Sequence, residues 1–367
     1  MKYYFLGLAA NYSREERLAH TFTRGRKEDL RDLENFLTRK YGGKRTILTK
    51  NGRSALTLAL RANFNEGDGI IVNGFTCYAV YEAIKEAGLV PIFADIDLRD
   101  LNFSVKELEE VKTANPKGII VQNTLGNPVD IVAIEQFAKD NNLVIIEDLA
   151  HSAGIKYPDG RETGTVGVAT VLSFGKDKAI DTISGGAVIL RAPHDNPIRA
   201  PKKAPKVSDY LRSRLYPTFG VIARVLTRVH LGGIFMRVLV KIHWVEKSAD
   251  NRLDLTRRLC RFEAARALLQ VKSLTYGGER PLREFCFVKN RREVLSKLKA
   301  AGYYFDGFWY EKPVSPERYY RRIDFPEEKC KNAVYAAKHI VNLPTYYRKK
   351  ELEPARKIIA EYLEEKK

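Results

Sequence analysis

The sequence predicts an α/β fold, with a large domain on a mostly parallel sheet followed by a smaller C-terminal α/β domain. Between Lys44 and Leu190, apolar runs of strand length alternate with segments of helical periodicity, which is the order that a parallel sheet requires. Several of these runs end in polar residues, as buried parallel strands do where their carboxyl ends bind ligands. The length of 367 residues suits a large and a smaller domain better than one small module.

The elements of the large domain follow from local sequence. A helix is expected where helical periodicity follows a glycine-containing turn, and a strand where a short apolar run stands between turn signals. Helices are predicted in chain order at 54–60, 79–87 and 131–141. Strands are predicted at 69–72, 90–95, 118–122, 143–147, 170–174 and 187–190.

The positive charge of the chain is concentrated in one segment. The sequence has 63 Lys and Arg against 45 Asp and Glu, a formal net charge of +18. Eleven basic residues and only two acidic residues lie between Ile198 and Lys247, so this segment carries half of the excess. Because no recognition motif accompanies the basic residues, nucleic acid is not an expected partner.

The basic segment is also amphipathic. Residues 200–208 are rich in Pro and Lys and predict a loop, and Pro217 can open a helix because a first turn does not use its missing N–H. At 100° per residue, Ile222, Leu226 and Val229 then share one face, with arginines on another. The predicted organisation is a large domain at 1–197, a basic amphipathic insertion at 198–250, a connecting helix at 251–280, and a small domain at 281–367 with helices at 291–301 and 353–364.

Composition excludes several classes of protein. Hydrophobic residues at 44% and charged residues at 29% are ordinary globular values and disfavour disorder. The four cysteines are far apart with no CxxC pair, which disfavours a zinc ribbon and a disulfide scaffold. The apolar stretch at the N-terminus is too short for a signal peptide, and no apolar run reaches the roughly 18 residues that span a bilayer. We therefore expect a cytoplasmic protein.

Three polar clusters stand where strands end or helices begin. Asn51–Ser54 contains Gly52 directly before a helix, so it is either an anion site at a helix N-terminus or an ordinary N-cap. Glu147–His151 places acids at the end of a buried strand, as a structural acid or a metal ligand, although no second ligand cluster supports metal. Ser173–Lys178 offers a lysine that is either a surface charge or a group able to form a Schiff base with a carbonyl cofactor.

Taken together and in this order, the clusters resemble the DegT/DnrJ/EryC1/StrS family of sugar aminotransferases, which depend on pyridoxal phosphate (PLP). The order and spacing are kept over about 140 residues, and the resemblance extends to the tail but not to the basic segment. The matching stretches are NGRSAL (51–56), GFTCYAVYEAIKEAGLVPIFADID (74–97), LGNPVDIVAIEQFAKDNNLVIIEDLAHSAG (125–154), GTVGVATVLSFGKDKAIDTISGGAVIL (164–190) and, less closely, RRLCRFEAARALLQ (257–270) and VNLPTYY (341–347).

The resemblance implies a fold and a set of residue roles. The fold would be the three-layer PLP-transferase large domain, similar to aspartate aminotransferase, with a small C-terminal domain. Lys178 matches the lysine that binds PLP covalently and moves the proton, and Asp148 matches the acid that pairs with the pyridine nitrogen. His151 matches a residue near the phenolic oxygen of PLP. The remaining cofactor-binding residues that it implies are Gly52, Arg53, Ser54 and Ser173 around the phosphate and Tyr78 beside the ring.

The sequence also departs from the family pattern. Cys77 stands where many members have the aromatic residue that stacks on the pyridine ring, and Tyr78 is the neighbour that could replace it. Thr256 stands where an asparagine reaches the phosphate of the neighbouring subunit. Arg53 and Ser184 replace a small hydroxyl residue and an acidic residue. Lys176 is a rival for the covalent bond, although the spacing from Ser173 favours Lys178.

The resemblance implies an aminotransferase that moves an amino group from an amino acid to a nucleotide-linked keto sugar, and a homodimer. Two alternatives remain: a PLP-dependent sugar dehydratase, in which histidine replaces the lysine, and an inactive homologue that acts as a membrane-associated scaffold or regulator of glycan assembly. For the insertion, residues 200–247 are interpreted as contacting an anionic membrane at the cytoplasmic face, attracting the anionic substrate, or packing on the dimer partner.

Overall fold

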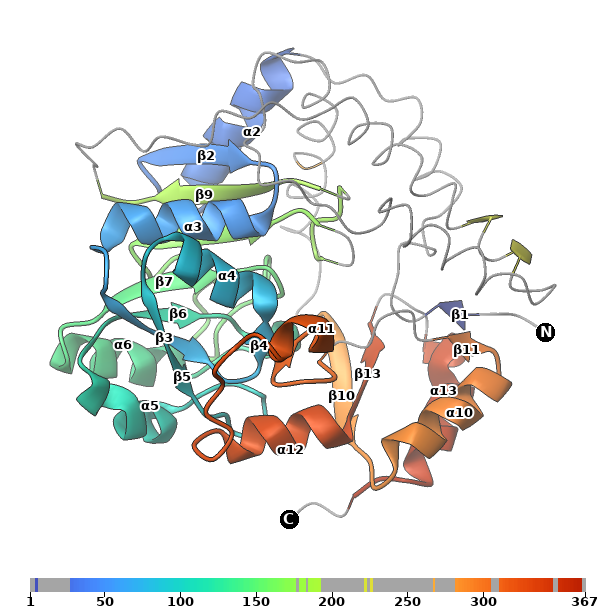
Figure 1. Cartoon of the computed structure of the whole chain (residues 1–367). Coiled ribbons are helices and arrows are strands. Elements are labelled where there is room, and N and C mark those ends of the chain that lie inside the picture. Colours follow the sequence, from blue (N-terminus) through green and yellow to red (C-terminus); the bar gives the residue numbers. More distant parts are fainter. Residues whose placement is uncertain are drawn as a thin grey trace.

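The central sheet dominates the computed structural model, which describes residues 27–175, 178–182, 184–192, 281–304, 310–345 and 349–364, with Tyr4–Phe5, 221–222, 225–226 and 267. The sheet has seven strands, shown in Figure 1. They are β2 (Arg45–Thr49), β3 (Gly69–Asn73), β5 (Val90–Ala94), β6 (Pro116–Val121), β7 (Val144–Asp148), β8 (Ala169–Ser173) and β9 (Gly186–Leu190). Their order is β2-β9-β8-β7-β6-β3-β5, and β9 alone runs antiparallel to its neighbours β2 and β8. The predicted mostly parallel sheet is thus confirmed.

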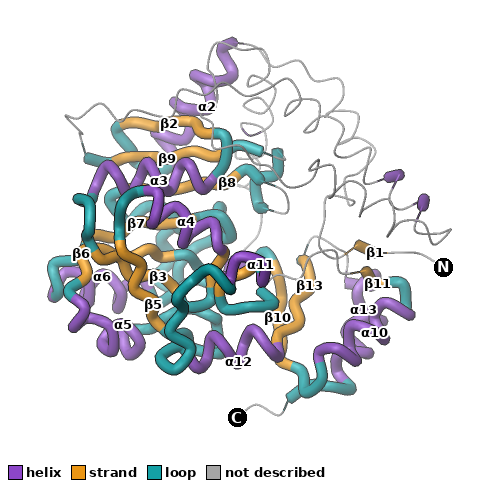
Figure 2. Tube along the Cα trace, viewed as in Figure 1, coloured by secondary structure: helices purple, strands orange, loops and turns teal. Residues whose placement is uncertain are grey.

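Helices cover both faces of the sheet, which makes three layers (Figure 2). Successive side chains of β3 point to opposite faces of the sheet. Ile70 and Val72 therefore pack in one hydrophobic cluster, and Ile71 packs in another on the opposite face. The first cluster includes residues of α3 and α4, and the clusters on the other face include residues of α2, α5 and α6. The bounds are α2 (Lys27–Lys40), α3 (Gly52–Asn63), α4 (Tyr78–Glu86), α5 (Val105–Val111) and α6 (Ile131–Asp140).

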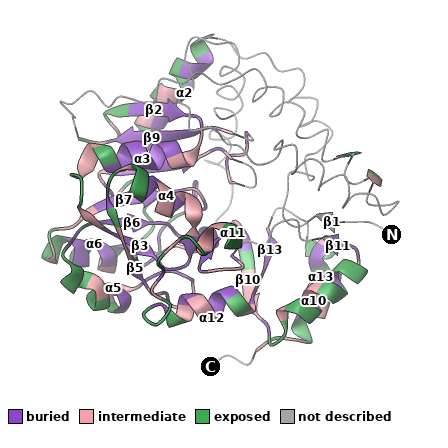
Figure 3. Ribbon diagram, in the orientation of Figure 1, coloured by how far each residue is buried: buried purple, intermediate pink, exposed green. Residues whose placement is uncertain are grey.

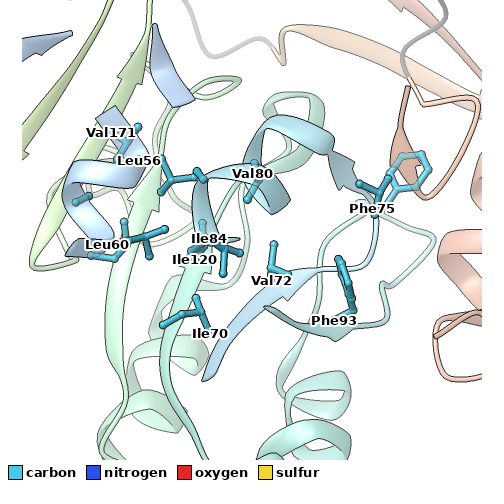
Figure 4. Packing of buried hydrophobic residues seen from close by; sticks show 14 of the residues in the cluster. Leu56, Leu60, Ile70, Val72, Phe75, Val80, Ile84, Phe93, Ile120 and Val171 are labelled. Carbon is cyan, nitrogen blue, oxygen red and sulfur yellow. The ribbon is translucent and has the colours of Figure 1, made fainter. Parts of the chain in front are cut away.

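The hydrophobic core lies between α3, α4 and the sheet. Leu56 and Leu60 of α3 and Ile84 of α4 are at most 2% exposed and gather over Ile70 and Ile120 of the strands (Figure 4). Burying each of these side chains contributes about 1.5–3 kcal/mol. Most residues of the sheet are buried, whereas the helices keep one exposed face (Figure 3). The close packing fixes the carboxyl ends of the strands, where the polar clusters stand.

The C-terminal part of the chain divides its contacts between two clusters. Residues including Val294, Leu298 and Leu352 form a cluster of their own, whereas Val314 and Ile340 pack in the cluster of the central sheet. The predicted domain boundaries therefore stay predictions. The elements are β10 (Arg283–Phe287), α10 (Arg291–Ala300), β11 (Tyr303–Tyr304), β12 (Val314–Ser315), α11 (Glu317–Tyr320), α12 (Lys331–His339), β13 (Ile340–Pro344) and α13 (Lys349–Ala360).

Three further pairings and short elements complete the described chain. β10 pairs antiparallel with β13, and β12 pairs in parallel with β4 (Thr76–Cys77), next to the sheet. β1 (Tyr4–Phe5) pairs with β11. Two 3-10 turns are η2 (Lys112–Ala114) and η3 (Thr124–Gly126). Asp95, just after β5, accepts the N–H groups of Asn332 and Ala333 at 2.9 Å each and so caps the start of α12.

Most predictions for the basic insertion lie outside the described residues. The exceptions are helical residues after Pro217, of which Ile222 is 37% exposed and Val225 is 55% exposed. Thr256 and the connecting helix at 251–280 are also outside, apart from the buried helical Ala267. In the part of the chain that the structure describes, no helix is both long and apolar enough to cross a membrane.

Candidate active site

The two acids at the end of β7 have different environments. Successive side chains of a strand point to opposite faces, so Glu147 and Asp148 are separated by the sheet. Glu147 is fully buried and its two carboxylate oxygens accept hydrogen bonds from the hydroxyl of Tyr157 at 2.7 Å and from the N–H groups of Gly164, Val166 and Gly167 at 2.6–2.8 Å. Glu147 thus organises the loop that leads into β8.

Replacing Glu147 by glutamine is expected to lower the free energy of unfolding by about 1–3 kcal/mol, because in either orientation the amide NH2 group would face at least one N–H donor. Denaturant unfolding measures the change. Glu135→Gln, which removes a charge from a surface pair with Arg161, serves as the control and is expected to cost about 0.5 kcal/mol. Equal stability of both variants would contradict the structural role of Glu147.

Asp148 lies on the face of α3 and α4 and is only 6% exposed. One carboxylate oxygen accepts the N–H of Ala150 at 3.0 Å. Burial raises the pKa of Asp148 above its ordinary value, while this hydrogen bond and the ammonium group of Lys178 lower it. A buried carboxylate has lost its hydration, so it interacts strongly with a cationic group placed beside it.

His151 is held neutral beside this acid. Its Nδ1 accepts the N–H of Leu125 in η3 at 3.2 Å, so the ring proton is on Nε2. Burial lowers the pKa of His151 well below its ordinary value, and the positive charges of Lys178 and Arg283 lower it further. The ring therefore presents an Nε2–H donor at neutral pH.

Lys178 lies in the loop between β8 and β9. Two backbone hydrogen bonds close the loop. The N–H of Thr182 donates to the carbonyl of Phe174 at 3.0 Å, and the N–H of Phe174 donates to the carbonyl of Gly185 at 2.8 Å. The side chain is half-buried, and its charge acts on both Asp148 and His151. The structure thus brings together three residues that the sequence singled out.

The start of α3 meets the end of β8. A Cβ on Gly52 would lie 2.7 Å from the Cβ of Ser173, so only glycine allows this approach. The Asn51 side chain caps the helix by accepting the N–H of Ser54 at 2.8 Å. The first N–H groups of the helix, next to a serine hydroxyl, form a cradle for an anion such as phosphate.

Two of the residues that the resemblance implies around the cofactor, Arg53 and Tyr78, contact other parts of the chain. The guanidinium of Arg53 forms an ion pair with Glu82 of α4. The ring of Tyr78 stacks on Tyr319 of α11, with centroids 4.4 Å apart and planes 14° apart. Cys77 accepts the N–H of Ala79 at 3.4 Å and caps α4.

The structure adds two site residues that sequence reasoning missed. Tyr310 is 4% exposed and its ring meets His151 edge-on, with centroids 6.3 Å apart. Arg283, at the start of β10, is 2% exposed and donates through Nε to Asn342 at 2.5 Å. Gly126 of η3 approaches the backbone just before Arg283 so closely that a Cβ would lie 2.5 Å from the nitrogen of Leu282. Neither Tyr310 nor Arg283 lies near the three polar clusters in the sequence.

The groups present fit one cofactor. A buried acid that favours a cation suits a pyridine nitrogen, a nearby lysine suits an aldehyde, and the cradle suits a phosphate. Among the described residues, no three His, Cys, Asp or Glu side chains gather as they would around a metal ion. A pyridine nitrogen, an aldehyde and a phosphate are the groups that PLP carries.

The family follows from comparison with known proteins. A profile of the DegT/DnrJ/EryC1/StrS aminotransferase family matches residues 12–198, half of the chain, and the protein belongs to this family. A GDP-perosamine synthase of Escherichia coli O157:H7 is 35% identical over 175 residues, which are 47% of this chain and 48% of that protein. A pleiotropic regulatory protein of Geobacillus stearothermophilus is 25% identical over 321 residues, 87% of this chain and 84% of that protein.

A solved structure extends the likeness over the whole fold. The E. coli GDP-4-keto-6-deoxy-D-mannose-3-dehydratase with bound hydrated PLP has a TM-score of 0.65 at 17% identity, covering 98% of this chain and 99% of that chain. At this identity the likeness concerns the fold. By sequence, the matched region spans about half the length of the first relative and most of the second.

Proposed function

We propose that the protein is a PLP-dependent aminotransferase that moves an amino group from an amino acid to a keto sugar carried on a nucleotide. The observation that carries this proposal is the convergence of Lys178 and Asp148 beside the anion cradle of Gly52 and Ser173. The family and the name of its relative, a GDP-perosamine synthase, support a nucleotide-sugar substrate.

The residues have separable tasks in this proposal. When bound, PLP supplies an electron sink for the carbon that gains or loses the amino group. Asp148 holds a proton on the pyridine nitrogen. The amine of Lys178 holds the cofactor covalently between turnovers and moves a proton to or from the reacting carbon of the substrate. The Nε2–H of His151 orients the phenolic oxygen, and Ser173 with the first turn of α3 holds the phosphate.

The proposal is tested with the purified protein, PLP, glutamate or glutamine, and a panel of keto nucleotide sugars. The resemblance implies a homodimer, so the protein is assayed in the oligomeric state in which it purifies. An amino sugar formed at the expense of the donor supports the proposal. If no member of the panel is aminated while PLP is bound, the proposed substrate class is wrong.

Two other functions compete. A dehydratase would have histidine in place of the lysine, and Lys178 argues against it. A regulator is favoured by one observation: the relative that matches the larger share of the chain is named a pleiotropic regulatory protein. Failure of the wild type to take up PLP would favour the regulator.

We propose that residues 200–247 bind an anionic membrane surface, because the segment combines its high net positive charge with exposed apolar residues such as Val225. Such an enzyme would act in polysaccharide or glycan assembly at the cytoplasmic face. The full chain is expected to sediment with vesicles that contain anionic lipid and not with neutral vesicles, and a 200–247 deletion is expected to stay in solution. Equal sedimentation of both proteins would contradict membrane binding.

A further inference from the structure

At Cys77 and Tyr78, where the resemblance places the aromatic ring that stacks on the cofactor, both side chains contact other parts of the chain. At the end of β4, Cys77 uses its sulfur to cap α4. The ring of the next residue, Tyr78, is stacked on Tyr319, whose other contacts include the guanidinium of Arg318 at 4.7 Å from the ring centroid. Tyr78 therefore belongs to a stack formed with α11.

Tyr310 is the aromatic residue that does converge on the site. Its ring packs on Phe75, with centroids 4.7 Å apart, and meets the ring of His151 edge-on. Burial raises its pKa well above the ordinary value, Cys77 and Asp148 raise it further when ionised, and Arg283 lowers it. It is thus placed among Cys77, Asp148 and His151.

The backbone at Tyr310 is strained to allow this placement. Its φ is +71°, in the left-handed region that bulky side chains rarely adopt. Such strain persists only where the surroundings hold it, and it concentrates at functional sites. Here the contacts with Phe75 and His151 hold the ring. The neighbouring β12 also pairs with β4, which carries Cys77, so the backbone that follows Tyr310 is held beside Cys77.

We propose that Tyr310, and not Tyr78, is the aromatic residue that packs against the ring of the bound cofactor. This inference rests on the proposed function, since it takes the cofactor to lie between Asp148 and Lys178. Offset or edge-to-face contact with a tyrosine ring stabilises a planar heteroaromatic group and excludes water from it. The ring thus comes from the C-terminal part of the chain.

The test measures PLP affinity by titration of the visible absorbance, and the circular dichroism of the bound PLP. Tyr310→Leu is expected to weaken binding about three- to tenfold and to change the dichroic band. Tyr310→Phe keeps the ring and is expected to stay within about twofold of the wild type. Tyr78→Leu is the comparison and Tyr81→Leu the control for losing another ring of α4. Weaker binding in Tyr78→Leu with unchanged binding in Tyr310→Leu would overturn the proposal.

Two safeguards keep the outcomes distinct. If Tyr310→Leu does not fold, as judged by thermal unfolding, Tyr310→Met fills similar space without a ring and is expected to show the same loss of affinity. If the wild type takes up no PLP at all, the proposed function fails. If the wild type binds PLP and the variants without a ring at 310 bind equally well, only the role of Tyr310 fails.

Discussion

Lys178→Ala is expected to lose aminotransferase activity by about 10⁴-fold or more, because it removes both the covalent attachment and the proton carrier. The half-buried loop that carries the lysine is held by backbone hydrogen bonds from Phe174 and Thr182, so the variant is expected to fold. Steady-state rates with the best nucleotide-sugar substrate measure the loss.

Lys176→Ala is the matched control for this variant, since it removes the lysine two residues earlier in the sequence. It is expected to stay within about threefold of the wild-type rate, because only Lys178 is assigned to the covalent bond. If Lys176→Ala is inactive and Lys178→Ala is active, the assignment of the two lysines is reversed.

Asp148→Asn is expected to lower kcat by about 10²–10³-fold, because a neutral amide does not hold a proton on the pyridine nitrogen. PLP affinity is expected to fall with it, since the buried charge pair is lost. Rates and visible absorbance titrations measure both effects. Activity close to that of the wild type would place the cofactor away from Asp148.

Without cofactor, Asp148→Asn is expected not to destabilise the fold. Burial raises the pKa of Asp148 in the folded protein, so its contribution to stability is present at low pH and is lost as the pH rises through that value. At a pH above that value the apo wild type contains a buried, destabilising charge. Thermal unfolding of apo Asp148→Asn is expected at a temperature equal to or above that of the apo wild type.

Much of the large domain could be predicted from the sequence because its signals are local. The strands at 69–72 and 187–190 are apolar runs between turns, and they appear as β3 and β9 within one residue of the predicted bounds. β2 was missed, since RTILT is a five-residue strand in which only Ile47 and Leu48 are strongly apolar. Its partner strand β9 is far away in the sequence, with Thr49 opposite Gly186, so the pairing depends on tertiary structure.

The candidate site likewise contains residues that local sequence predicts and residues that only tertiary packing brings in. Asp148, His151 and Lys178 could be predicted because each stands at or just after a strand end within one run of 31 residues. Tyr310 and Arg283 could not, because packing of the C-terminal part brings them in from more than 100 residues away. Arg53 and Tyr78 lie within the motifs, yet their side chains contact Glu82 and Tyr319, and only tertiary structure decides these contacts.

Peptide mapping of the borohydride-reduced protein tests the central claim most directly. Wild-type protein is incubated with PLP, reduced, digested and analysed by mass spectrometry, with Lys178→Ala as the control. The account predicts a yellow protein that bleaches on reduction, with the phosphopyridoxyl group on Lys178 and none in the variant. A colourless protein, or modification of another lysine, would contradict it.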